Sequence, residues 1–196
     1  MKKEFKATQD YIITSKGTGL VLEVAEGSKE DGAAVQLWEA TEAKQQRWLI
    51  KQTKEGSYQI LSKTSGKCLD AMVGGTEDGT WIHQWTFVEG SNQLWTIEKV
   101  EEGIYKIKNA DKCLDIIGMR SENGARLQLW TDVNGDNQQW VITPAPKKTV
   151  TKKATEKAEA AEEAKPAAKK VSKKTETTGE AKVKKAPAKK AAKKAE

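Results

Sequence analysis

Short runs of alternating apolar and polar residues, separated by Gly, Asn and Asp, occupy the first 143 residues of the chain. Between residues 58 and 99 these runs predict strands at about 58–62, 67–71, 81–85 and 94–99. Asp-Gly and Asn-Gly pairs supply the positive φ that tight hairpins need. Helical periodicity is absent before residue 144, so the pattern predicts an all-β fold.

The tryptophans show that this pattern occurs three times. Six of the seven form pairs ten residues apart, which are Trp38 with Trp48, Trp85 with Trp95, and Trp130 with Trp140. Fifteen residues before each pair lies an acid, and these acids are Glu23, Asp70 and Asp115. A glycine precedes each pair by six residues, and a tyrosine opens each unit. The repeats therefore span about 11–57, 58–104 and 105–143.

Three units of four strands could form a three-bladed propeller, a small sandwich or a closed barrel with threefold pseudosymmetry. Repeats that cannot bury their own apolar faces must pack against one another. We favour the closed barrel because closure removes unpaired edge strands.

Composition divides the chain into two parts. All Trp, Tyr, Phe and Cys residues lie in residues 1–143, for which we expect one domain. Residues 144–196 hold 17 lysines and seven glutamates, a net charge of +10, which leaves −4 for residues 1–143. Without aromatic residues, Leu or Ile, this tail cannot offset the entropy of ordering, so we expect it to be disordered.

Each repeat brings together the residue types that bind a sugar. A sugar ring presents a face of C–H groups, which packs on an aromatic side chain, and hydroxyls, which bond to carboxylates and amides. The Cys-Leu-Asp strand, the Gln-x-Trp and the final Asn-Gln-x-Trp resemble those of the ricin B-chain type lectins, also described as family-thirteen carbohydrate-binding modules. The resemblance covers about residues 11–143. It implies a β-trefoil that binds galactose-type or related sugars.

The resemblance also implies roles for individual residues. The acid accepts hydrogen bonds from two sugar hydroxyls, the first tryptophan stacks on the ring, the Asn bonds a hydroxyl, and the following Gln holds the acid. The third repeat matches throughout, with Asp115, Gln128, Trp130, Asn137 and Gln138. The second repeat has Asp70, His83, Trp85, Asn92 and Gln93.

The first repeat departs further and predicts a weaker site. Its set is Glu23, Gln36, Trp38, Gln45 and Gln46. Glu23 and Gln45 replace an Asp and an Asn, and each extra methylene displaces the polar head by about 1.5 Å. The second tryptophan of each pair is expected in the core instead, at Trp48, Trp95 and Trp140.

Other chemistry is disfavoured. His83 is the only histidine, so neither a catalytic triad nor a histidine metal cluster can form, and we expect no cofactor. A glycosidase needs two carboxylates about 5–10 Å apart, whereas Asp70 and Asp115 belong to separate repeats. Cys68 and Cys113 occupy the same slot of two repeats, which favours buried free thiols over a disulfide. Trp81 either extends the rim of the second site or packs internally.

The tail suggests a further partner. Its paired lysines resemble the Lys/Ala-rich tails of linker histones in composition, and residues 182–196 hold seven lysines and one glutamate. The tail could be a solvated tether, a binding segment for DNA, RNA or another polyanion, or a dock for an acidic protein. An alternative function is therefore a nucleic-acid-associated protein in which the trefoil is a scaffold or a protein-interaction domain.

The N-terminal segment bears on location. Two early lysines are not followed by the apolar run of a signal peptide, and no membrane span is visible. We therefore expect the protein to be a monomer in the cytoplasm. The alternative is export by a route that does not use a signal peptide.

Overall fold

The computed structural model describes residues 4–146, so the predicted disorder of residues 144–196 lies almost wholly outside the described residues. The described part contains twelve strands: β1 (Asp10–Ser15), β2 (Val21–Val24), β3 (Val35–Trp38), β4 (Trp48–Gln52), β5 (Tyr58–Ser62), β6 (Cys68–Ala71), β7 (Ile82–Trp85), β8 (Thr96–Glu101), β9 (Ile104–Asn109), β10 (Lys112–Ile116), β11 (Ala125–Thr131) and β12 (Trp140–Pro144). Six 3-10 turns join them: η1 (Ala25–Gly27), η2 (Lys44–Gln46), η3 (Met72–Gly74), η4 (Ser91–Gln93), η5 (Ile117–Met119) and η6 (Asp136–Gln138).

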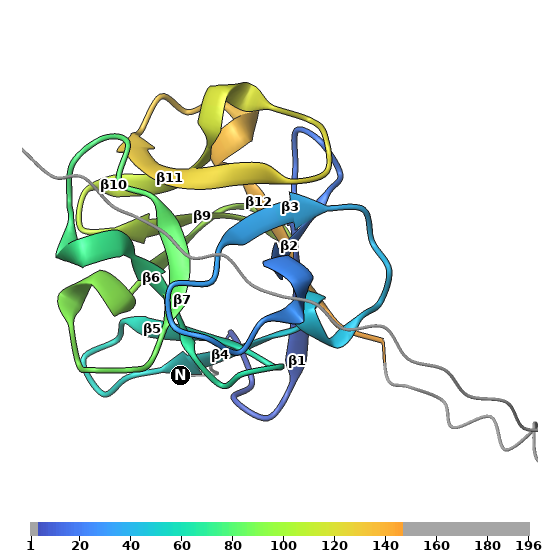
Figure 1. Ribbon diagram of the computed structural model, residues 1–196. Coiled ribbons are helices and arrows are strands. Elements are labelled where there is room, and N and C mark those ends of the chain that lie inside the picture. The colour runs from blue at the N-terminus through green and yellow to red at the C-terminus, as the bar shows by residue number, and fades with distance from the viewer. Residues whose placement is uncertain (1–3, 147–196) are drawn as a thin grey trace, which may run out of the picture. The chain divides into compact units, whose positions relative to one another are not determined.

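Six of the strands close into a barrel. The antiparallel pairs β12–β1, β1–β4, β4–β5, β8–β9 and β9–β12 form most of the ring. A bridge between Tyr58 and Trp95 joins β5 to the residue before β8 and completes it. The hairpins β2–β3, β6–β7 and β10–β11 meet at one end, where β3, β7 and β11 surround the centre of Figure 1. The fold is the expected β-trefoil.

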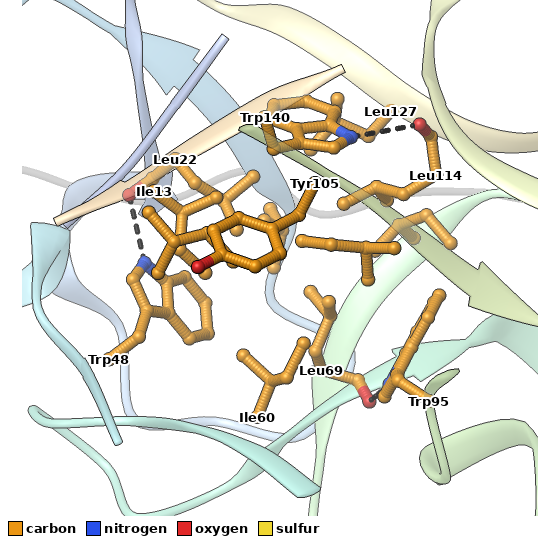
Figure 2. Packing of buried hydrophobic residues seen from close by; sticks show 14 of the residues in the cluster. Ile13, Leu22, Trp48, Ile60, Leu69, Trp95, Tyr105, Leu114, Leu127 and Trp140 are labelled. Carbon is orange, nitrogen blue, oxygen red and sulfur yellow. Dashed lines mark hydrogen bonds between the residues drawn. The ribbon is translucent and has the colours of Figure 1, made fainter. Parts of the chain in front are cut away.

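The second tryptophan of each pair lies in the core, as predicted. Trp48, Trp95 and Trp140 have no exposed surface. Their Nε1–H groups donate to the carbonyls of Leu22, Leu69 and Leu114 at 2.9, 3.0 and 3.2 Å (Figure 2). Each bond spans 26 residues and ties the end of a repeat to its hairpin, which satisfies the indole donor inside an apolar core.

The sequence predicted the strand positions to within one or two residues in the second repeat but did not predict the 3-10 turns. In the second repeat, β6, β7 and β8 begin one or two residues after the predicted positions. The glycines of the Asp-Gly and Asn-Gly pairs do have positive φ, at 82° for Gly32 and 88° for Gly79 and Gly124. However, these glycines lie in the long connections that follow β2, β6 and β10, where their N–H groups bond to the next repeat, and not in tight hairpins.

Cys68 and Cys113 are buried free thiols, as the repeat geometry predicted. Burial raises the pKa of each thiol to about 11, so both remain protonated at neutral pH.

Within residues 4–146 there is no helix with the length and apolar character to cross a membrane.

Candidate functional site

The three hairpins present their acids at equivalent positions. Strand pairing places Glu23 opposite Gln36, Asp70 opposite His83, and Asp115 opposite Gln128. All three acids are buried. A buried carboxylate requires hydrogen-bond donors, so the partners of these acids define the sites.

The third site brings its whole predicted set together. Asp115 Oδ1 accepts a hydrogen bond from Gln128 Nε2 at 2.9 Å. Asp115 Oδ2 accepts from Asn137 Nδ2 at 2.6 Å and from Gln138 Nε2 at 3.0 Å. Gln138 also donates to the Thr131 carbonyl at 2.9 Å, which fixes its amide between the acid and β11. The carboxylate is therefore held in one orientation by three amide donors.

The second site has the same acid and a different set of donors. His83 Nε2 lies 2.7 Å from Asp70 Oδ1, and Asn92 Nδ2 donates to Asp70 Oδ2 at 3.0 Å. Gln93 Nε2 donates to the Thr86 carbonyl instead of to the acid. The His83 ring stacks on Trp85 with centroids 5.4 Å apart, and its buried Nδ1 has no partner within residues 4–146. His83 thus contacts both the Asp70 carboxylate and the Trp85 ring.

The first site contains a cavity. Glu23 still accepts hydrogen bonds from Gln36 and Gln46, both at 3.0 Å. Gln45 does not bond to Glu23, unlike the Asn at the same position in the other repeats. Instead it lines a cavity of about 380 Å³ together with Glu23, Gln36 and Trp38. The longer side chain therefore separates the amide from the carboxylate.

The first tryptophan of each pair faces outward beside its acid. Trp85 and Trp130 are each 39% exposed, whereas their partners in the core have no exposed surface. Trp38 is half-buried. Each of these tryptophans lies two residues after the Gln or His that bonds the acid, on the same face of its strand. The second and third sites therefore combine a fixed hydrogen-bond acceptor with an exposed aromatic surface. Residues 4–146 contain no cluster of three or more His, Cys, Asp or Glu residues that could hold a metal ion.

The pKa values of two aspartates in the third repeat are shifted in opposite directions. Burial raises the pKa of Asp115 above its usual 3.8, although the amide donors oppose the shift. The hydrogen bond from Lys106 lowers the pKa of Asp132 to about 2. As the pH falls through the Asp115 midpoint, protonation of Asp115 by itself raises the free energy of unfolding, because this group binds the proton more tightly in the folded state than in the unfolded state. The contribution of Asp132 is present above 3.8 and is lost as the pH falls toward 2.

Carboxyl carbon NMR of the full chain measures both titrations. We expect a midpoint above 3.8 for Asp115 and one near 2 for Asp132. A midpoint for Asp115 below 3.8 would show that the three amide donors outweigh burial.

An inter-repeat contact that the sequence did not predict holds the segment after each outward tryptophan. The Asp31 carboxylate, from the first repeat, accepts hydrogen bonds from the Thr86 backbone N–H at 2.6 Å and from Lys67 Nζ at 2.6 Å. The neighbouring Gly32 N–H donates to the Gln84 carbonyl at 2.9 Å. These bonds fix the chain on both sides of the second aromatic plate. The hydrogen bond from Lys67 lowers the pKa of Asp31, so the acid is charged at neutral pH.

The contact recurs around the pseudo-threefold axis. Asp78 accepts from the Thr131 backbone N–H at 2.6 Å and pairs with Lys112 at 3.1 Å. Asn123 accepts from the Glu39 backbone N–H at 2.8 Å. An Asp at position 123 would bring a second negative charge close to Glu39, so the neutral Asn suits this contact. The sequence signal for this network was the Asp-Gly or Asn-Gly pair whose glycine lies six residues before each tryptophan pair.

Replacing Asp78 with Ala should loosen the third site alone. The Thr131 amide loses its acceptor, so its hydrogen exchange should accelerate by roughly tenfold. Thr86, held by Asp31, is the internal control, and Glu77→Ala is the matched surface control. Equal exchange of Thr131 in the wild-type chain and in Asp78→Ala would contradict the role of this contact.

A β-trefoil in which each of three hairpins places a tryptophan beside a buried acid belongs to the class of repeat proteins with pseudo-threefold symmetry. Residues 9–140 match the ricin-type beta-trefoil lectin domain. The chain therefore belongs to the ricin-type β-trefoil lectin family. No curated protein sequence matches it significantly.

Solved structures agree with this assignment. A designed threefold symmetric protein, ThreeFoil, is 29% identical with a TM-score of 0.67, over 68% of this chain and 97% of that one. An exo-β-1,3-galactanase from Clostridium thermocellum is 30% identical with a TM-score of 0.69, over 73% of this chain and 32% of that one. A ricin B-like lectin from Macrolepiota procera, solved with lactose, shares the fold at 24% identity and a TM-score of 0.62, over 72% of this chain and 99% of that one.

Proposed function

We propose that the second and third repeats bind galactose-type or related sugars, and that the first repeat binds them more weakly. The observation that carries this proposal is a buried, amide-held carboxylate beside an outward tryptophan, at Asp70 with Trp85 and at Asp115 with Trp130. Packing alone does not explain an exposed indole next to an oriented acid. Lectin activity of the family supports the assignment.

The third site would hold a sugar by two kinds of contact. The C–H face of the ring packs on Trp130, while neighbouring hydroxyls bond to Asp115 and Asn137. Stacking contributes about 0.5–1.5 kcal/mol beyond area burial, and each hydrogen bond contributes about 1 kcal/mol net. After the cost of association, a monosaccharide should bind with a dissociation constant on the order of millimolar. Stronger binding requires a glycan that engages two or three sites together.

The same geometry favours binding over catalysis. Each acid is surrounded by side-chain donors from its own repeat, and the second carboxylate that glycoside hydrolysis requires is not supplied by that set. The galactanase neighbour is an enzyme, but this chain covers only 32% of it. We therefore propose a non-catalytic lectin.

The tail suggests a second activity. Seven lysines within residues 182–196 would attract a polyanion such as DNA or RNA through its phosphates, without base readout. DNA binding by the full chain at low and high salt tests this proposal. Affinity should fall steeply with added salt and should be weakened by replacing these seven lysines with Gln. Binding that salt and the seven replacements leave unchanged would contradict it.

A glycan array with the full chain tests the lectin function. We expect binding to galactose-terminated glycans and its loss in a variant carrying Asp70→Ala and Asp115→Ala. The matched control, Asp111→Ala with Glu77→Ala, changes two acids of the same repeats and should retain binding. An array without any ligand, or unchanged binding by the double site variant, would overturn the proposal.

A further inference from the structure

The pseudo-threefold axis carries a side-chain cluster outside the three sites. Two residues before Gln36, His83 and Gln128, the repeats have Ala34, Trp81 and Arg126. These three residues share a strand face with the site residues, because side chains two apart point the same way. Each is also paired across to the next repeat, as Ala34 with His83, Trp81 with Gln128, and Arg126 with Gln36. The cluster therefore lies where β3, β7 and β11 meet (Figure 1).

Exposed Trp81 and half-buried Arg126 form a pair within this cluster. Trp81 is 50% exposed, more than the 39% of Trp85 and Trp130. The Arg126 guanidinium lies 5.2 Å from the centroid of the Trp81 ring, within the range of a cation–π contact. The first repeat contributes only the methyl group of Ala34 at the equivalent position. Half of the surface of Trp81 is thus open beside a cation.

Arg126 differs from the other two arginines of the chain in its partners. Arg47 donates to the Pro146 carbonyl, and Arg120 pairs with Glu122. Among residues 4–146, by contrast, no carboxylate lies within 4 Å of the Arg126 nitrogens, and its buried Nε lacks an acceptor. A guanidinium presents a rigid fork of donors that matches a carboxylate. Arg126 is therefore suited to a negatively charged ligand.

The neighbouring sites exclude such a ligand from their own surfaces. Each contains a buried carboxylate, at Glu23, Asp70 or Asp115, which would repel a second negative charge. Residues 1–143 also carry a net charge of −4. An anionic sugar that approaches this end of the barrel would thus find its favourable contact at Arg126.

We propose that Trp81 and Arg126 form a fourth binding point, on the axis, for a pyranose that carries a carboxylate, such as a uronic acid. The sugar packs its C–H face against the open part of Trp81, and its carboxylate accepts hydrogen bonds from Arg126. Trp81 lies four residues before Trp85, about 13 Å along the strand. A short acidic oligosaccharide could therefore reach from the axis to the second site. The axial point uses none of the residues of the three proposed sugar sites.

The test is an NMR titration of the full chain, in which each tryptophan gives one indole N–H signal. Glucuronate and glucose are compared at equal ionic strength, and Trp81→Phe identifies the Trp81 signal. We expect glucuronate to shift this signal with roughly tenfold higher affinity than glucose. Arg126→Gln should remove that preference, whereas Arg120→Gln should leave it unchanged. Unperturbed signals from Trp48, Trp95 and Trp140 show that each variant is folded.

Equal responses to glucuronate and glucose would overturn the axial site. So would a preference that survives Arg126→Gln, because the carboxylate would then be bound elsewhere, for example by the lysine-rich tail. Lactose, followed at the Trp85 and Trp130 signals in the same samples, reports separately on the proposed lectin sites. Failure of either proposal is therefore distinguishable from failure of the other.

Discussion

Trp95→Ala is expected to lower the free energy of unfolding by about 3–5 kcal/mol, because it removes a large, fully buried side chain from a core that cannot collapse completely. Trp95 has no exposed surface, and its Nε1–H bonds to the Leu69 carbonyl at 3.0 Å. The substitution therefore creates a cavity and also leaves a buried carbonyl without its donor. Denaturant unfolding followed by circular dichroism measures the loss.

Trp85→Ala is the matched control for this loss, since it removes the same side chain from the same repeat at a position that is 39% exposed. We expect a much smaller change in stability. Equal destabilisation by the two substitutions would contradict the assignment of the inner tryptophan to the core and the outer one to a site.

The second large effect concerns binding. Combined replacement of Trp85 and Trp130 by Ala should weaken glycan binding at least tenfold, because each substitution removes the surface on which the sugar packs. The fold should persist, since both indoles are partly exposed and neither provides a buried hydrogen bond. Isothermal titration with the best glycan from the array measures this loss.

Trp81→Ala serves as the control in that experiment, because it removes an exposed tryptophan that lies outside the three sites. Its affinity for a neutral galactose-terminated glycan should match that of the wild-type chain. If the double variant also retains its affinity, the outward tryptophans are not the stacking plates.

Repetition in the sequence predicted the fold and which residues each candidate site brings together. Ten-residue tryptophan pairs and aligned acids predicted three units, and strand pairing then required each acid to lie opposite its Gln or His. The separate fates of Trp130 and Trp140 followed from the family resemblance, and the structure shows the physical reason. Trp140 can donate to Leu114 inside the barrel, whereas Trp130 lies on the outer face of β11.

Contacts between repeats were not predictable in the same way. Asp31 and Asp78 hold the segments after Trp85 and Trp130, but each is more than fifty residues away from its partner in the chain. Spacing within a single repeat contains no information about such pairs. Gln93 likewise matches the expected motif, yet it donates to the Thr86 carbonyl and not to Asp70, whereas Gln138 at the same position of the third repeat donates both to its acid and to the Thr131 carbonyl.

We propose that the outward tryptophans bind sugar and the inner ones do not. A lactose titration of the full chain, followed through its indole N–H signals, tests it most directly. We expect saturable shifts for Trp85 and Trp130, none for Trp48, Trp95 and Trp140, and loss of the shifts in the variant carrying Asp70→Ala and Asp115→Ala. Stationary signals from Trp85 and Trp130 at saturating lactose, or shifts that persist in that variant, would contradict it.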